Sequence, residues 1–245
     1  MTNNIPEKKL TSISAIFPAY NDGGTIASMV LTARISLGRH SDDYEIIVIN
    51  DGSRDYTADV LNELAKRIPE LNVVHHESNQ GYGATLRHGF RLARKEWIFY
   101  TDGDAQYNPL EMGALVDALR PGIDVVNGYK IARNDPLHRK IIGRIYHHVS
   151  RMAFGFKLRD VDCDFRLIRR KLFENIELES RDGAICVEMV KKFQDAGCQF
   201  AEVPVNHYHR QYGKSQFFNW WPILRSLWHL AQLWWQLVVK KTHLR

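Results

Sequence analysis

WIFYTDGDAQ, at residues 97–106, is an apolar, strand-like run that ends at two carboxylates separated by one glycine. In extended chain, residues i and i+2 point the same way, so Asp102 and Asp104 can share one cation, while Gly103 lets a phosphate approach the backbone closely. Magnesium is held by one or two carboxylates together with substrate phosphate oxygens and water. The stretch therefore predicts a buried strand followed by a metal-bound diphosphate site, and a solvated turn is the alternative for an isolated Asp-Gly-Asp.

The chain up to about residue 130 alternates β-rich runs with amphipathic helical patterns. We expect strands over residues 13–17, 44–50, 72–75, 97–101 and 124–128, and helices over 25–34, 57–67, 83–94 and 110–119. Apolar strands alternating with helices predict an α/β fold with a mostly parallel sheet, in which ligands bind beyond the carboxyl ends of the strands. Polar clusters at 18–22, 51–53, 79–83 and 102–104 each follow a strand, so they are expected to form one site.

The second half of the chain has a looser pattern. A helix to about Phe154, a charged segment at 159–166, a helix over 184–196 and a strand over 200–203 are expected. Five of the six tryptophans lie in the last 30 residues, which sets this end apart. The organisation expected is a polar tail at 1–11, a catalytic domain at 12–216 and a Trp-rich amphipathic helix at 217–245.

The composition is that of an ordinary globular protein, with 44% hydrophobic and 25% charged residues among 245. The three scattered cysteines have no metal-ligand spacing, which indicates reduced thiols, and the polar N-terminus does not resemble a signal peptide. A cytoplasmic location is therefore expected. The net charge of +5 favours polyanionic partners, so a non-catalytic basic protein that binds membranes or nucleic acid is one alternative.

Seven ordered motifs resemble glycosyltransferase family 2, and within it the enzymes that load a sugar onto dolichyl or other polyprenyl phosphates. The resemblance covers roughly residues 12–216 and is carried by FPAYND at 17–22, INDGS at 49–53, NQGYGATLRHG at 79–89, DGDAQYNP at 102–109, GYKIARNDP at 128–136, DCDFR at 162–166 and HYHRQYGKS at 207–215. It implies a GT-A type, Rossmann-like fold in which a nucleotide sugar lies across the strand ends.

The same resemblance implies roles for the polar clusters. A divalent metal, Mg²⁺ or Mn²⁺, is expected on Asp102, Asp104 and Gln106. The donor is expected to contact Pro18, Tyr20, Asn21, Asp22, Asp51, Asn79, Gly81, Asp102, Gly103 and Asp104. For Asp51-Gly52-Ser53 the alternative is a turn in which Ser53 or Asp55 caps the next helix.

Phosphate groups of donor and acceptor are implied to bind in the second half of the chain, at Arg133, Arg139, Arg210, Lys214 and Ser215. In RQYGKS at 210–215, a guanidinium, an ammonium and a hydroxyl surround a glycine and can wrap a phosphate. Many relatives carry a lysine after this serine, whereas this chain has Gln216 there. A solvated basic loop is the alternative.

The reaction expected is transfer of a hexose from a nucleotide diphosphate to a lipid monophosphate, with inversion. A phosphate monoester, with a second pKa near ~6, is mostly dianionic at pH 7 and needs no strong base. Positive charge from residues such as Arg133 would instead offset the repulsion between two anions. The residues expected to act in catalysis are Asp104, Asp162, Asp164 and Arg133, while Glu188 could face the sugar or lie on a solvated face. An acceptor with a sugar hydroxyl, as in polysaccharide synthesis, would make an aspartate base mandatory.

A single polar stripe marks the Trp-rich end, with Arg225, His229, Gln232 and Gln236 at steps of four, three and four. The remaining surface of this helix is apolar and followed by lysines, which favours a helix lying at a lipid–water boundary. Docking on the protein core or on a neighbouring subunit is the alternative. The partners expected are a nucleotide-diphosphate sugar, a polyprenyl or dolichyl phosphate and the membrane surface, with homo-oligomers possible and no nucleic acid.

Overall fold

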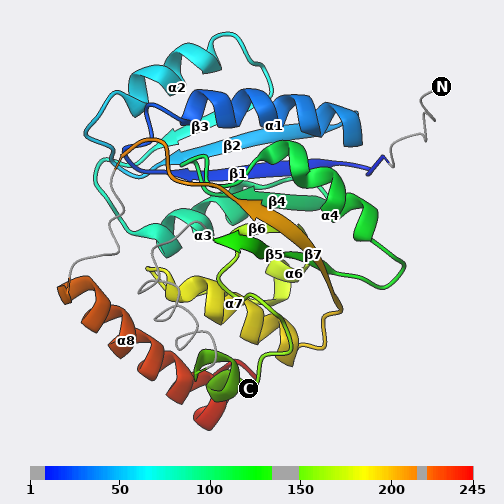
Figure 1. Ribbon diagram of the computed structural model, residues 1–245, viewed down its shortest axis with the longest axis vertical. Helices are drawn as coiled ribbons and strands as arrows, with labels where there is room; N and C mark the ends of the chain where they lie inside the picture. Colours follow the sequence, from blue (N-terminus) through cyan, green and yellow to red (C-terminus); the bar gives the residue numbers. More distant parts are fainter. Residues whose placement is uncertain (1–8, 134–148, 214–219, 245) are drawn as a thin grey trace.

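A seven-stranded sheet forms the centre of the molecule in the computed structural model, which describes residues 9–133, 149–213 and 220–244 (Figure 1). The strand order is β3-β2-β1-β4-β6-β5-β7. The strands are β1 (Ile13–Ala19), β2 (Tyr44–Asn50), β3 (Leu71–His75), β4 (Trp97–Thr101), β5 (Val125–Arg133), β6 (Phe165–Arg169) and β7 (Phe200–His207). Neighbouring strands pair in parallel except at β6, which runs antiparallel to both β4 and β5. The expected α/β fold with a mostly parallel sheet is confirmed.

Strand β6 differs from the expectation of a charged segment ending at residue 166. Phe165, Leu167 and Ile168 are buried in the middle of the sheet, where β6 fills the space between β4 and β5. The side chain of Arg166 is also buried, beneath the ring of Tyr100. Burial on both faces removes the polar alternation by which a strand is recognised in sequence, and the surrounding charges hid this one.

Helices cover both faces of the sheet, as the alternation of strands and helices predicts. On one face lie α1 (Ile26–His40), α2 (Thr57–Ala65), the short η1 (Pro109–Glu111) and α4 (Met112–Ala118); on the other lie α3 (Tyr82–Leu92), α6 (Leu172–Asn175) and α7 (Ala184–Asp195). Residues 149–154 are helical, and the rest of the helix expected up to Phe154 lies outside the described residues. Apolar side chains of these helices pack on the two faces of the sheet and form two hydrophobic clusters.

The Trp-rich end forms α8 (Trp220–Trp234), which continues as a π-helical turn (Trp235–Lys240) and a 3₁₀ turn (Thr242–Leu244). Leu233 and Leu237 are 7% and 2% exposed and pack against Val187 and Val190 of α7. Helix α8 therefore lies outside α7 as an additional layer (Figure 1). Among the described residues, we find no helix with the length and apolar character needed to cross a membrane.

Candidate active site

A cleft of about 740 Å³ opens at the carboxyl ends of β1, β2 and β4. The polar clusters that follow these strands meet in it because parallel strands end at one edge of the sheet. Predicted residues that line it are Pro18, Tyr20, Asp22, Asp51, Asn79, Asp102, Gly103, Asp104, Asp162, Asp164 and Arg210. One cleft thus gathers residues from positions 18 to 210 of the chain.

The acidic turn after β4 presents two carboxylates with different partners. Asp102 Oδ1 accepts a hydrogen bond from the hydroxyl of Tyr82 at 2.8 Å. Asp104 is 2% exposed, and its Oδ1 accepts the backbone N–H of Gln106 while its Oδ2 accepts Arg210 Nη2 at 2.5 Å. The turn is therefore held by its own backbone, by α3 and by the segment that follows β7.

Several carboxylates crowd the cleft and alter one another's protonation. Burial, followed by repulsion from Asp164 and Asp104, raises the pKa of Asp102 well above its usual value. Burial is also the largest cause that raises the pKa of Asp22 to about 6, while the nearby guanidinium of Arg210 opposes that rise. A positive charge bound in the cleft would stabilise the ionised forms of all these groups.

The donor atoms of the cleft suit a hard divalent cation, which prefers carboxylate oxygens. Asp102 and Asp104 offer such oxygens, and a bound cation would offset the burial and the carboxylate repulsion that raise the pKa of Asp102. Within the described part of the chain, no group of three or more His, Cys, Asp and Glu side chains is arranged to hold a metal, so a cation here would also need other ligands. The third ligand expected, Gln106, does not line the cleft; its side chain donates to the carbonyl of Tyr208 at 3.3 Å.

Asp51, after β2, is buried and anchors the loop that follows β3. Its Oδ1 accepts the backbone N–H of Gln80 and lies 2.7 Å from His76 Nδ1, and its Oδ2 accepts the N–H of Gly81. This carboxylate borders the cleft while it fixes the loop that carries Asn79. Asp51 thus has a structural task that sequence alone did not indicate, in addition to its predicted contact with the donor.

Asp162 and Asp164 reach the cleft from the turn before β6. Burial raises the pKa of Asp162 to about 6, and the ammonium of Lys130 is the main opposing influence. Asp164 Oδ1 accepts hydrogen bonds from the Cys186 thiol at 3.0 Å and from the Tyr100 hydroxyl at 3.3 Å. Both predicted candidates for a base therefore face the same space as Asp102 and Asp104.

The remaining predicted residues lie away from the cleft wall or outside the described residues. Asn21 and Gly81 lie next to lining residues, and the Asn21 backbone adopts a positive φ of 56°. The side chain of Arg133, and all of Arg139, Lys214 and Ser215, lie outside the described part. Their roles in binding phosphate remain predictions.

Glu188 on α7 neither faces the cleft nor lies on a solvated face, so both expectations for it were wrong. It is 1% exposed, accepts the backbone N–H groups of Glu179 and Ser180 at 2.9 and 2.8 Å, and pairs with Lys192 at 2.7 Å. A buried carboxylate is stable only with such partners. Sequence analysis could not place Glu188 because tertiary contacts decide its environment: α7 directs this side chain toward residues 179 and 180.

Five residues that sequence analysis did not single out also line the cleft: Ala19, Tyr82, Thr85, Gly183 and Cys186. Tyr82 and Thr85 lie within the motif at 79–89, so that motif could have indicated them. Gly183 and Cys186 come from the start of α7, which the fold brings beside Asp164. No local pattern in the sequence marks these two positions.

The fold and the cleft define an α/β protein with an open cleft at the carboxyl ends of parallel strands, beside an acidic turn, which is where proteins of this architecture bind ligands. The model of the family described as "Glycosyl transferase family 2" matches residues 14–177, about two thirds of the chain. The chain therefore belongs to glycosyl transferase family 2.

Curated relatives include proteins named for sugar transfer. The chain is 28% identical over 237 residues to "Glycosyltransferase AglD" of Haloferax volcanii, covering 93% of this chain and 38% of the relative. It is 26% identical over 212 residues to the "Undecaprenyl-phosphate 4-deoxy-4-formamido-L-arabinose transferase" of Yersinia enterocolitica, covering 86% of this chain and 64% of the relative. The resemblance to polyprenyl-phosphate sugar transferases is thus confirmed, although both relatives are longer than the part that this chain spans.

Solved structures confirm the GT-A type fold. Glucosyl-3-phosphoglycerate synthase from Mycobacterium tuberculosis, in complex with Mn²⁺, uridine diphosphate and glucosyl-3-phosphoglycerate, matches with a TM-score of 0.66 at 19% identity. The match covers 93% of this chain and 77% of that protein. A second complex of the same enzyme, with phosphoglyceric acid, matches with a TM-score of 0.66 at 18% identity.

Proposed function

We propose that this protein transfers a hexose from a nucleotide-diphosphate sugar to a polyprenyl or dolichyl phosphate, with inversion at the anomeric carbon and with a divalent metal. The observation that carries the proposal is the cleft in which Asp22, Asp102, Asp104 and Asp164 come together, with Arg210 as the only Arg or Lys among the described residues that line it. Such a surplus of carboxylates favours a cation as part of the ligand. A nucleotide diphosphate that binds together with a divalent metal would supply such a cation.

The donor would be held by groups from several strand ends. When bound at Asp102 and Asp104, the metal would neutralise the departing diphosphate. Arg210 is placed to exchange its contact with Asp104 for a phosphate oxygen, because a guanidinium binds both kinds of oxygen anion with the same geometry. Asp51 and its loop form the side of the cleft where we expect the nucleoside.

The names of the curated relatives support a lipid phosphate as acceptor, since several are undecaprenyl-phosphate transferases. An acceptor phosphate that is already ionised needs orientation and charge compensation more than a base. Asp162, with a pKa raised to about 6, would orient the sugar or take up a proton when the acceptor arrives protonated. An acceptor with a sugar hydroxyl remains the second candidate, favoured by the two aspartates that face the metal turn.

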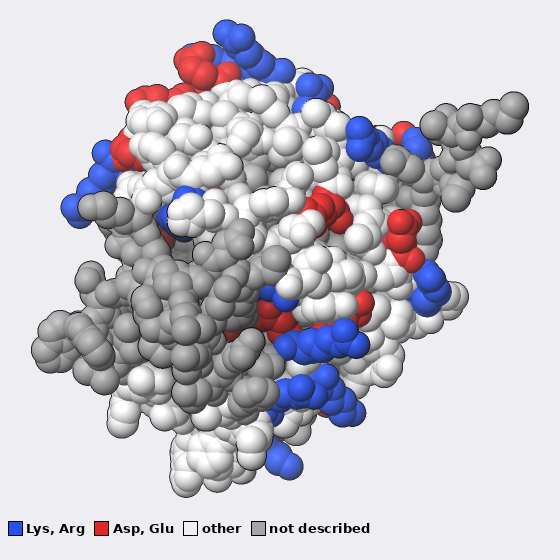
Figure 2. Space-filling view, viewed as in Figure 1, with Lys and Arg blue, Asp and Glu red and all other residues white. Residues whose placement is uncertain are grey.

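We further propose that α8 contacts the membrane with the face that points away from α7. Trp228 and Trp235 are 64% and 50% exposed on this face, beside the exposed Leu227 and Val239. The segment from 220 to 241 has no Asp or Glu and ends in two lysines, which favours an anionic lipid surface. Figure 2 shows mostly uncharged surface at the lowest part of the molecule, where the C-terminal end of α8 lies in Figure 1.

The face of the membrane would be the cytoplasmic one. Cys163 and Cys186 are buried free thiols, and Cys198 is a third free cysteine that lies partly exposed. Unpaired cysteines are typical of a reducing compartment.

The proposal is tested by transfer assays with radiolabelled UDP- and GDP-hexoses and with undecaprenyl phosphate or a matched polyprenol as acceptor, with Mn²⁺, Mg²⁺ or EDTA. We expect a metal-dependent product only with the phosphorylated lipid. Transfer to polyprenol or to an oligosaccharide would favour the hydroxyl acceptor. No transfer from any donor in the panel would contradict the proposed activity.

A further inference from the structure

The segment at 179–183, between α6 and α7, lies directly against the start of α3. The backbone N–H groups of Gly83 and Ala84 donate to the carbonyl of Arg181, at 2.9 and 3.4 Å. Arg87, one turn further along α3, donates to the carbonyl of Glu179 at 2.7 Å. The segment therefore supplies acceptors to the N–H groups that the first turn of a helix leaves unpaired.

The contact between this segment and α3 leaves no spare room. A Cβ atom added at Gly81 would lie 2.5 Å from the carbonyl oxygen of Arg181, and one added at Gly83 would lie 2.5 Å from that of Ser180. Backbone thus packs directly on backbone. A displacement of the segment must move the start of α3 with it, because packed backbones have no flexible side chain between them that could absorb the shift.

The start of α3 and the start of α7 both belong to the cleft. Tyr82, the first residue of α3, donates to Asp102 Oδ1, and Gly183 and Cys186 line the cleft from α7. Cys186 in turn donates to Asp164. The position of the segment therefore affects two of the carboxylates in the cleft.

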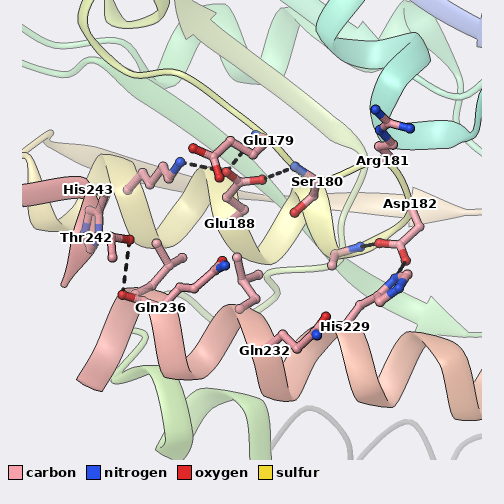
Figure 3. A pocket seen from close by; sticks show the side chains of 14 residues that line it. Glu179, Ser180, Arg181, Asp182, Glu188, His229, Gln232, Gln236, Thr242 and His243 are labelled. Carbon is pink, nitrogen blue, oxygen red and sulfur yellow. Dashed lines mark hydrogen bonds and ion pairs between the residues drawn. The ribbon is translucent and has the colours of Figure 1, made fainter. Parts of the chain in front are cut away.

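The opposite side of the same segment contacts α8. Asp182 Oδ2 bonds to Nδ1 of His229, and Asp182 Oδ1 accepts the N–H of Ala184 at 3.0 Å in the first turn of α7 (Figure 3). The side chains of Asp182 and His229 are each about one third exposed, and they lie in the wall of a polar pocket of about 420 Å³ between α7 and α8. Gln232 and Gln236 of α8 also line this pocket, so these two residues of the polar stripe and His229 face the protein rather than the lipid side.

We propose that contact of α8 with a lipid surface is transmitted to the catalytic cleft through His229 and Asp182, which act as positioning residues. Lipid contact on the outer face would fix α8; the hydrogen bond from His229 would then fix Asp182 and the segment at 179–183, and with them the starts of α3 and α7. The cleft would be fully ordered only on a membrane, where a lipid acceptor is available. The inference depends on the proposed membrane contact and adds a regulatory link to it.

The test is hydrogen–deuterium exchange of the full chain, with and without vesicles of phosphatidylglycerol and phosphatidylcholine in equal parts. In the wild type, we expect vesicles to slow exchange of α8 and also to slow exchange over 80–88 and 179–190 by about fivefold, the effect of one retained hydrogen bond. In His229→Ala, α8 should still be protected by vesicles while the other two regions no longer respond. A thermal melt of each variant shows whether it is folded.

Two further variants separate coupling from general loss of structure. Gln232→Ala removes a polar side chain from the same helix and the same pocket and should respond to vesicles like the wild type. His229→Gln keeps a donor that can reach Asp182 and should restore part of the response. The affinity for UDP and for GDP in the presence of Mn²⁺ should also respond to vesicles. We expect this response to be largest in the wild type and Gln232→Ala, smaller in His229→Gln and absent in His229→Ala.

The outcomes also distinguish this inference from the proposed function. Vesicle protection of α8 without any change over 80–88 and 179–190 in the wild type overturns the inference and leaves the membrane contact intact. An unchanged response in a folded His229→Ala also overturns it. If α8 itself gains no protection, the proposed membrane contact fails and the inference fails with it.

Discussion

The guanidinium of Arg210 bridges two carboxylates that lie at the ends of different strands. Its Nη2 donates to Asp104 Oδ2 at 2.5 Å, and its Nη1 lies 4.0 Å from Asp22 Oδ1. One basic group that follows β7 therefore balances acids that follow β1 and β4. This contact joins the last strand of the sheet to the predicted metal turn, and it is where the charge balance of the cleft can be tested.

Replacing Asp104 by Asn should abolish metal-dependent transfer and leave the fold intact. The amide keeps the shape of the side chain but removes a charge that would hold the cation, so we expect activity to fall by about 100-fold or more. Initial rates at saturating Mn²⁺, together with a thermal melt, measure both properties. Asp117→Asn, at an exposed position on α4, is the matched control. Full activity in Asp104→Asn would remove this residue from the metal site.

Replacing Arg210 by Gln should weaken binding of the nucleotide diphosphate. The loss of a charge-assisted contact to phosphate, worth roughly 1.5–3 kcal/mol, predicts an affinity lower by about ten- to 100-fold. Isothermal titration with UDP and GDP in the presence of Mn²⁺ measures this change. Arg39→Gln, on the exposed side of α1, should bind like the wild type. Equal affinities in both variants would mean that Arg210 serves only its partner Asp104.

Asp162→Asn should stabilise the protein at neutral pH but not in acid. The folded-state pKa of Asp162, about 6, lies above the ordinary aspartate value of 3.8, so ionised Asp162 costs the folded state free energy once the pH exceeds both values. The cost is on the order of 3 kcal/mol at pH 8 and disappears as the pH falls below about 4. Urea unfolding of wild type and variant should show a gain of about 3 kcal/mol at pH 8 and almost none at pH 3.5. The same stability difference between wild type and variant at both pH values would contradict this prediction. The transfer activity of Asp162→Asn should be lower than that of the wild type.

Glu188→Ala should destabilise the fold strongly. Removing Glu188 leaves the buried ammonium of Lys192 without its carboxylate partner. It also leaves the backbone N–H groups of Glu179 and Ser180 without an acceptor. Breaking a buried ion pair in this way costs about 3–5 kcal/mol. Urea unfolding measures the loss. Glu177→Ala, whose side chain is exposed in the same region, should change stability by less than about 0.5 kcal/mol. A small effect of Glu188→Ala would mean that water replaces the carboxylate.

The two faces of α8 should respond differently to substitution. Trp228→Ser with Trp235→Ser removes exposed aromatic surface, so vesicle sedimentation should decrease while the melting temperature changes little. Leu233→Ala removes a buried side chain and should cost about 2–5 kcal/mol of stability with vesicle binding retained in the folded fraction. Equal vesicle binding by the wild type and the tryptophan double variant would contradict the proposed lipid-facing side.

Much of the fold could be predicted from local patterns. The apolar run before Asp102 and the other strands of the first half were recognised because burial and strand period act over a few residues. Strand β6 was missed because its neighbours in the sheet, rather than its own sequence, make it buried on both faces. The cleft could be predicted once the strands were recognised, because the carboxyl ends of parallel strands meet at one edge of the sheet.

The sequence by itself determined the alternation of strands and helices, the family and the acidic turn at 102–104, because each depends on residues close together in the chain. Only the tertiary structure decided that Arg210 pairs with Asp104, that Glu188 holds the segment before α7, and that His229 of α8 contacts Asp182. These contacts join positions that lie from 8 to 106 residues apart. Charges and hydrogen bonds act through space, so the partner of a side chain is fixed only when the chain has folded.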